Sequence, residues 1–251
     1  MFLSIGVSNT KSINAYFGLI LINVFFGDNY LMKRGLNQII EKLREQIIFA
    51  GGEIITGAKC VNLEKIEKNF YIKYQKDNRI KKIIFDKIIS TVPPTDLIKF
   101  FKFDELKPLE KIDYNPMILY VITSVNKLWD NTWGLVVCDE NSPIYALCDW
   151  GNIIKATKHT PILAICSPSS TPDEIISELK RLFPRDKNRH KLIFEKKWII
   201  GLHQSNEKLF KIPKIVANKL PKNFYLAGDW MVLPALEGAV ISGNKIAKLI
   251  L

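Results

Sequence analysis

Two kinds of hydrophobic pattern alternate along the chain, and the first is helical. Apolar side chains recur at the spacing of a helix face between residues 36 and 47, and charged side chains occupy the opposite face. Gly51 and Gly52 follow this run, and glycine readily adopts the left-handed conformation that ends many helices. The pattern therefore predicts an amphipathic helix that stops before residue 51.

The second pattern consists of short runs rich in β-branched and aromatic residues, which predict strands. The first group of expected strands lies at residues 53–56, 60–67, 70–75, 79–85 and 87–91. Asp77 and Asn78 predict a hairpin turn within this group. Pro93 and Pro94 end the group, because proline cannot donate a hydrogen bond to a sheet, and a short helix is expected over residues 95–101.

Strands return in the middle of the chain. They are expected at residues 117–125, 133–137, 144–148, 162–167 and 192–200. Thr171 and Pro172 suit the cap and the first turn of a helix, which predicts a helix over residues 172–183. A buried strand at residues 224–227 and a helix at residues 238–251 complete the chain.

Length and hydropathy set the broad class. With 251 residues and 47% hydrophobic residues, the chain can form one large domain or two small ones. Residues 13–26 are the one candidate for a membrane helix, but this run is shorter than the ~20 residues that span a bilayer and contains Asn14 and Asn23. We expect a buried helix there, or one that partly touches lipid.

The formal net charge of +11 raises the question of a nucleic-acid partner. The lysines are scattered, and the densest basic stretch, residues 184–191, is interrupted by Asp186. A nucleic-acid-binding protein is expected to show a basic stripe together with a recognisable module, and neither is present. We therefore expect no nucleic-acid partner, while a peripheral contact with an anionic membrane surface stays open.

Cysteine usage argues against metal binding and secretion. Cys60, Cys138, Cys148 and Cys166 are far apart and form no CxxC pair. This spacing predicts no metal site and no disulfide framework. A cytoplasmic location with reduced thiols is the expectation.

The stretch that carries chemistry lies near the end of the chain. An apolar strand leads into Gly228 and Asp229, and a helix rich in small residues follows. Glycine lets a ligand approach the backbone, and an aspartate accepts hydrogen bonds from sugar-like hydroxyl groups. Gly238, Ala239, Ser242 and Gly243 are expected to leave one helix face bare, so that a flat ring such as a flavin can lie against the helix start.

This combination resembles the C-terminal FAD motif of the superfamily of flavin amine oxidases, protoporphyrinogen oxidases and phytoene desaturases. The match is to Leu226-Ala227-Gly228-Asp229-Trp230, Leu233-Pro234 and Glu237-Gly238-Ala239, which look most like the desaturase branch. The resemblance implies that Gly228 and Asp229 meet the ribityl-pyrophosphate part of FAD. It also implies that Glu237, Gly238, Ala239 and Val240 meet the pyrimidine edge of the flavin.

A second resemblance lies upstream, in the same order as in the superfamily. It comprises a glycine-containing helix start at residues 30–36, the Gly51-Gly52 turn, the strand that contains Val61, and residues 86–93. By resemblance, the backbone of Val61 contacts the adenine side of FAD. Arg34 departs from the pattern, because relatives often carry glycine there.

The GxGxxG segment that opens the superfamily's cofactor domain is not found in this sequence. Three explanations stay open: a truncated reading frame, a split enzyme whose GxGxxG half is a separate chain, or a degenerate remnant. Alone, the chain is expected to bind FAD poorly.

The expected fold is mixed α/β, a partial two-domain flavoenzyme fold with an antiparallel sheet in the substrate domain. The expected parts are a helical remnant of the substrate domain (1–29), an FAD-domain part (30–95), a substrate-binding domain (96–200) and a C-terminal FAD-binding part (201–251).

The expected function is that of an FAD-dependent oxidoreductase acting on a hydrophobic substrate, with isoprenoids as one option. Residues 117–125 contain no lysine, whereas amine oxidases carry one on the corresponding strand, so amine substrates are disfavoured. No catalytic residue is assigned. His159, His190 and His203 are expected at the surface, with His203 the best candidate for a base. The alternative function is a non-catalytic binding module similar to the GDP-dissociation inhibitors.

Overall fold

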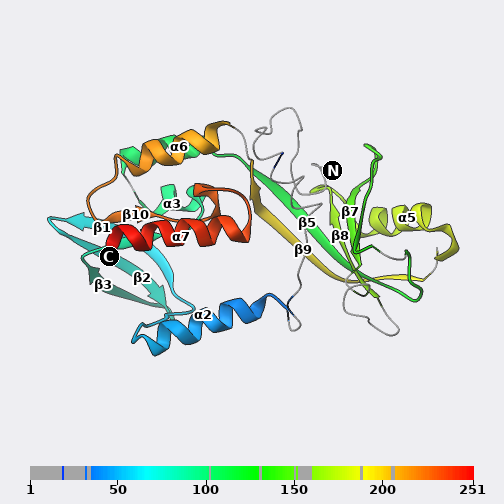
Figure 1. The fold of residues 1–251 in the computed structure, drawn as a ribbon, viewed down its shortest axis with the longest axis horizontal. Coiled ribbons are helices and arrows are strands. Elements are labelled where there is room, and N and C mark those ends of the chain that lie inside the picture. The colour runs from blue at the N-terminus through cyan, green and yellow to red at the C-terminus, as the bar shows by residue number, and fades with distance from the viewer. Residues whose placement is uncertain are drawn as a thin grey trace. The chain divides into compact units, whose positions relative to one another are not determined.

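The computed structural model describes residues 19, 32, 35–101, 103–129, 132–149, 151, 160–186, 189–204 and 207–251. These residues form two compact units (Figure 1). Of the described residues, unit 1 contains those from 114 to 204, and unit 2 contains those from 19 to 113 and from 207 to 251. The sequence places the corresponding boundaries at residues 95 and 200.

Unit 1 is built on a five-stranded antiparallel sheet with the order β6-β7-β8-β5-β9. Its strands are β5 (Tyr114–Ser124), β6 (Gly134–Val136), β7 (Ile144–Asp149), β8 (Thr160–Cys166) and β9 (His190–His203). The helix α5 (Pro172–Leu182) covers one face of this sheet, and a short turn, η4 (Pro184–Asp186), follows it.

Alternating burial along β5 explains why α5 packs on one face only. Ile118, Tyr120 and Ile122 point to the helix face and are buried together with Ile175 and Leu179 of α5. The Tyr120 hydroxyl donates a hydrogen bond to the Ser170 carbonyl at 3.0 Å, so the one polar atom in this row has a partner. No described helix packs on the opposite face, where the side chains of β5 are half-buried.

Unit 2 combines an antiparallel meander with a parallel pair of strands. The meander is β1 (Lys59–Ile66), β2 (Asn69–Lys76) and β3 (Arg79–Phe85), and the parallel pair is β4 (Ile88–Ser90) and β10 (Phe224–Leu226). Its helices and turns are α2 (Asn37–Phe49), α3 (Pro94–Phe100), η3 (Asp104–Lys111), α6 (Glu207–Ala217), η5 (Asp229–Met231) and α7 (Leu236–Ile250).

The core of unit 2 gathers around the ring of Phe224. The rings of Phe70, Phe101 and Phe103 have centroids 5.9, 5.5 and 6.0 Å from it. Tilted and edge-on contacts at these distances are favourable for aromatic rings. This cluster joins β2, the end of α3 and the following loop to β10, so it fixes the strand that leads into Gly228.

Most elements expected from the sequence are confirmed. The helix α2 is followed by Gly51 with a φ of +81°, and the turn between β2 and β3 places Asp77 and Asn78 at φ values of +50° and +58°. Thr171 and Glu174 cap α5 reciprocally. The sheet of unit 1 and the parallel pair of unit 2 give the expected mixed α/β class.

One expected strand is absent, two observed elements were not expected, and one expected helix is not tested. Residues 53–56 belong to no strand, because they pair with no neighbour in the described part of the chain. The helix α6 and the turn η3 were not expected; each contains a proline, Pro213 and Pro108, which weakens a helical pattern. The expected helix at residues 13–26 lies outside the described residues, apart from Leu19.

No helix among the described residues is both long enough and apolar enough to cross a bilayer.

Candidate functional site

The site expected at the tail is organised around Gly228. This glycine lies two residues after the end of β10 and has a φ of +139°, a backbone conformation that residues other than glycine rarely adopt. Its N–H donates a hydrogen bond to Ser242 Oγ at 3.0 Å, and Ser242 is buried on α7. A single bond thus ties the end of β10 to the second turn of the final helix.

Asp229 and Trp230 continue the chain as a short turn. One Asp229 carboxylate oxygen accepts a hydrogen bond from the Trp230 N–H at 2.9 Å, and the side chain is half-buried. Trp230 is 1% exposed, and its indole lies where a side chain at Gly228 would stand. The bulky ring therefore fixes the glycine and the aspartate that follow the strand.

The start of α7 has no side-chain cap in the described residues. Ala235 is its N-cap and makes no side-chain cap, so the first-turn N–H groups are not satisfied by a local side chain. Such a helix start carries partial positive charge and suits an anionic group. At the other end of α7, Lys87 donates to the Ile250 carbonyl at 3.1 Å, which satisfies one of the last carbonyl groups.

The small residues of α7 do not share one bare face, which corrects the sequence expectation. Gly238 and Ser242 are buried one turn apart, and a Cβ at position 238 would collide with the Leu233 carbonyl. Gly243 faces open space and is exposed. The glycine at 238 thus lets the preceding loop pack against the helix, and any contact of Gly238 with a flavin would come from its backbone.

The other predicted site residues fall into two places. Asp229 follows Gly228 directly, and Glu237, Ala239 and Val240 belong to the first five residues of α7, where the side chains of Glu237 and Val240 are exposed. Val61 lies on the meander, at a bulge in β1, and its side chain is exposed. The structure therefore gathers the tail residues and puts Val61 on a separate element of the same unit.

These residues fit a flavin in three respects. Gly228 leaves the end of β10 without a side chain, Asp229 offers acceptor oxygens beside it, and the uncapped start of α7 offers N–H donors. A pyrophosphate-ribityl group needs close backbone approach and hydroxyl acceptors, and a reduced flavin edge needs donors for its negative charge. The donor set and the glycine agree with the cofactor that the sequence predicts.

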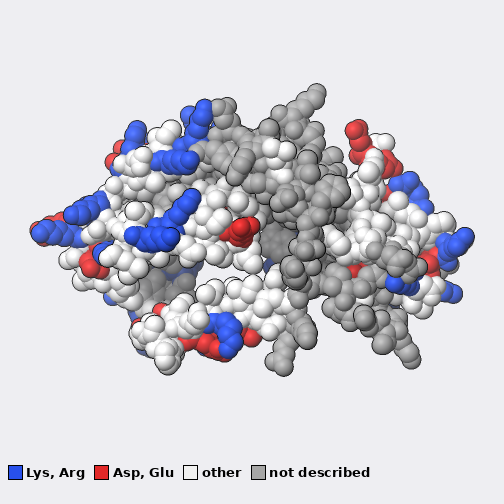
Figure 2. All heavy atoms as spheres, in the orientation of Figure 1, with Lys and Arg blue, Asp and Glu red and all other residues white. Residues whose placement is uncertain are grey.

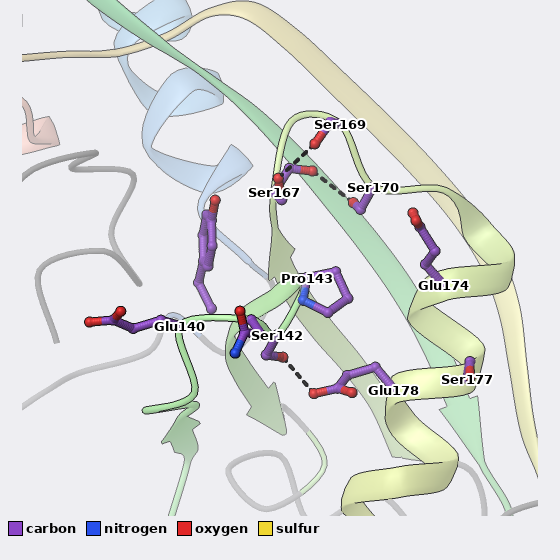
Figure 3. Close-up of a pocket in the computed structure, with 11 residues that line it drawn as sticks. Glu140, Ser142, Pro143, Ser167, Ser169, Ser170, Glu174, Ser177 and Glu178 are labelled. Carbon is purple, nitrogen blue, oxygen red and sulfur yellow. Dashed lines mark hydrogen bonds between the residues drawn. The ribbon is translucent and has the colours of Figure 1, made fainter.

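A polar pocket of unit 1 has a structural role (Figure 3). It has a volume of about 450 Å³ and lies between the loops before β7 and before α5 and α5 itself. Ser142 donates to Glu178 at 2.6 Å, and Arg181 donates to both Glu178 oxygens at 2.7 Å. The Arg181 guanidinium lowers the pKa of Glu178, against the opposing effect of burial. Since the Glu174 carboxylate caps Thr171, two of the three carboxylates that line the pocket hold the fold together.

The histidines differ from their expected surface positions. His203, at the end of β9, is 2% exposed and meets the Tyr114 ring edge-on at a centroid distance of 6.2 Å. His190 is half-buried, and burial lowers its pKa. A histidine so enclosed by strand and ring contacts is part of the core of unit 1, and His159 lies outside the described residues.

One cationic residue was missed by the sequence analysis. Lys196 on β9 stands directly across from Leu119 of β5, and the two side chains point to the face of the sheet that α5 does not cover. Residues 117–125 alone do not reveal this lysine, because β5 pairs with β9 over a long sequence separation.

The surface charge is dispersed. Figure 2 shows Lys and Arg side chains spread over several elements and mixed with Asp and Glu on the face that it draws. The ion pairs Lys42–Glu45 and Lys99–Asp96 are local pairs of this kind on exposed helix surfaces. The expectation that no nucleic acid binds stays a prediction.

Comparison with known proteins identifies the family. The model of the family described as flavin containing amine oxidoreductase matches residues 12–251. No curated protein sequence matches. The chain superposes on a protein assigned as a protoporphyrinogen oxidase from Exiguobacterium sp. 255-15 with a TM-score of 0.73 and 17% identity, over 87% of this chain and 51% of that one.

Two other solved structures share the fold. An oxidoreductase from Methanosarcina mazei gives a TM-score of 0.69 at 15% identity, over 98% of this chain and 62% of that one. A CLA-producing fatty acid isomerase from P. acnes gives 0.62 at 14%, over 86% of this chain and 52% of that one. This chain thus spans about half to three-fifths of the length of the structures it matches. It belongs to the flavin-containing amine oxidoreductase family, for which FAD is the cofactor.

Proposed function

We propose that this chain supplies the C-terminal half of the cofactor cradle and the substrate sheet of an FAD-dependent oxidoreductase. The observation that carries the proposal is the link from Gly228 at φ +139° to Ser242 of α7, which holds the strand end beside an uncapped helix start. Gly228 and Asp229 would hold the ribityl-pyrophosphate part of FAD. Glu237, Gly238, Ala239 and Val240 would meet the flavin edge, and the Val61 backbone the adenine side.

A bound flavin would supply the hydride acceptor and pass electrons on to a second substrate. The residues of this chain would bind and orient. First-turn N–H groups of α7 would stabilise negative charge at the edge they face, since they point outward from the positive end of the helix. Asp229 would fix hydroxyl groups through its carboxylate. No side chain is assigned as an acid or base, because hydride removal from an apolar substrate depends mainly on orientation.

We further propose that a polypeptide bearing a GxGxxG segment completes unit 2, either in one chain with it or as a separate partner. A parallel sheet is normally covered on both faces and contains more than two strands, whereas β4 and β10 form a pair. No side chain of α2 is buried, and Leu236 and Val240 of α7 are exposed. A further polypeptide could bury these apolar side chains and pair with residues 53–56, and so complete the hydrophobic core around the sheet.

The proposed substrate is hydrophobic. Support comes from the face of the unit 1 sheet that α5 leaves open, where Val121 and Leu163 pair across β5 and β8. One relative of known structure is named a fatty acid isomerase, which associates this fold with an apolar substrate in that protein. Isoprenoids are a second class compatible with such a face. A non-redox module that binds an apolar chain is the alternative function, since the same face would serve it.

Visible absorption tests the proposal. The chain is co-expressed with a GxGxxG-bearing segment encoded upstream of or beside it, and the purified complex is scanned for flavin bands. A yellow complex with one FAD per pair is expected. A colourless complex that still forms would contradict the redox function and favour the non-redox alternative.

A further inference from the structure

The sheet of unit 1 has one face covered by α5 and one that we call the open face. Strand register assigns side chains to it, because directly paired residues point to the same side. Its members are the residues that lie in register with Leu119 and Val121, together with Met117, Thr123 and the residues paired with those two.

Two rows of apolar residues run straight across the five strands. The first row is Val136, Ala146, Ile165 and Leu119, and it ends on β9 at Lys196. The second is Gly134, Cys148, Leu163 and Val121, and it ends at Phe194. Four strand spacings make each row about 19 Å long. The open face is therefore a long apolar floor with a cation at its β9 end; the middle of the floor is half-buried, and Ala146 is buried.

The β9 end of this floor is exposed to solvent. Phe194 is 54% exposed and Trp198 is 38% exposed. The Lys196 ammonium lies 5.9 Å from the centroid of the Trp198 ring, so the cation and the aromatic surface adjoin. Large aromatic side chains gain from being covered, and a ligand that covered them would lie beside Lys196.

The charge of the open face has a single sign in the described residues. Lys191 and Lys196 belong to this face, whereas register puts Asp149 and Glu195 on the side of α5, across from Ile162 and Tyr120. Lys191 stands opposite Thr123, beyond the apolar rows, and Lys196 closes the first row. The complementary ligand is an apolar chain with one anionic end.

We infer that the open face binds an extended apolar chain with a carboxylate or phosphate head, and that Lys196 is the residue that pairs with the head. This inference rests on the proposed function, because it names the substrate class of the same enzyme. The binding of the chain itself requires no flavin. Phe194 and Trp198 cover the part of the chain next to the head, and the aliphatic rows carry the rest.

The test uses three probes with one common tail: oleate, oleyl phosphate and oleyl alcohol. Each is titrated into the full chain below its micelle concentration, and binding is followed by tryptophan fluorescence. The anions are expected to bind about fivefold more tightly than the alcohol, the upper end of the range for one exposed ion pair. Whichever anion shows the larger ratio identifies the head.

Lys196→Gln is compared with Lys197→Gln, whose parent lysine points to the other face and donates to the Pro168 carbonyl at 3.1 Å. Lys196→Gln is expected to abolish the preference for anions and leave the affinity for oleyl alcohol unchanged, while Lys197→Gln keeps the preference. The inference is overturned if the wild-type chain binds none of the probes, binds the alcohol as tightly as the anions, or loses the preference equally in both variants. Circular dichroism confirms that each variant is folded, and FAD absorption, measured separately, tells a failure here from a failure of the flavin proposal.

Discussion

The indole of Trp230 occupies the space in which a side chain at Gly228 would lie. A Cβ at position 228 would stand 2.6 Å from Trp230 Nε1 and 2.8 Å from Cδ1, and Trp230 itself is 1% exposed. Two observations therefore require glycine at position 228: its φ of +139° and the lack of room for a side chain beside the Trp230 indole. This pair fixes the direction in which the chain leaves β10 and presents Asp229.

Gly228→Ala is therefore expected to lower the free energy of unfolding by about 1–3 kcal/mol, the cost of a non-glycine residue in a strained conformation. Gly243→Ala is the matched control in α7, where a Cβ meets nothing within 4 Å. An alanine in an exposed helix interior is expected to raise stability by roughly 0.5–1 kcal/mol. Urea unfolding of both variants measures the difference, and equal effects would contradict the assigned geometry.

Ser242→Ala removes the acceptor of the Gly228 N–H bond. The expected loss is about 1 kcal/mol, the net worth of a buried hydrogen bond, with faster exchange of the Gly228 amide hydrogen. Ser177→Ala, at an exposed position of α5, is the control for the helix propensity of alanine. Hydrogen exchange followed by NMR checks the outcome, and an unchanged Gly228 amide would show that the bond is unimportant.

The carboxylate of Glu178 makes the stability of unit 1 depend on pH. Its pKa lies below the ordinary glutamate value of 4.5 because Arg181 and Ser142 bond its charged form. A depressed pKa stabilises the folded state above the unfolded-state value, and this contribution is lost as the pH falls through the folded-state value. Stability should therefore drop as the pH falls below about 4.5.

Glu178→Gln is expected to lower stability at neutral pH by about 1–3 kcal/mol and to flatten the acid limb of the stability curve. Glu140→Gln, at an exposed residue that lines the same pocket, should leave that limb unchanged. Denaturant unfolding between pH 3 and 7 gives both curves. If stability falls with acid as steeply in the Glu178→Gln variant as in the wild type, carboxylates other than Glu178 cause the loss of stability.

Features that depend on neighbours along the chain were predictable. The Thr171–Glu174 capping box and the turn at Asp77 and Asn78 are set by residue types one to three positions apart, and both are present. The order strand, Gly228, Asp229, helix was also correct, because a glycine after an apolar run marks a sharp exit. Local chemistry alone determines these elements.

Features that depend on distant pairing were not predictable. Residues 53–56 have the composition of a strand but no partner among the described residues. The inward position of Gly238 follows from the packing of the Leu233 carbonyl on α7, which helical periodicity does not reveal. Lys196 lies on the open face because β9 pairs with β5. The paired residues Leu119 and Lys196 are 77 residues apart in the sequence (196 − 119), so local patterns do not reveal their pairing.

The central claim is that the tail of this chain holds a flavin, and FAD affinity measures it most directly. FAD is titrated, by quenching of its fluorescence, into the complex of the chain with its GxGxxG-bearing segment. Asp229→Ala is expected to weaken binding about tenfold or more, the worth of hydrogen bonds to a charged group, whereas Asp86→Ala, at an exposed turn before β4, leaves it unchanged. Equal FAD affinity in the wild type and the Asp229 variant would contradict the account.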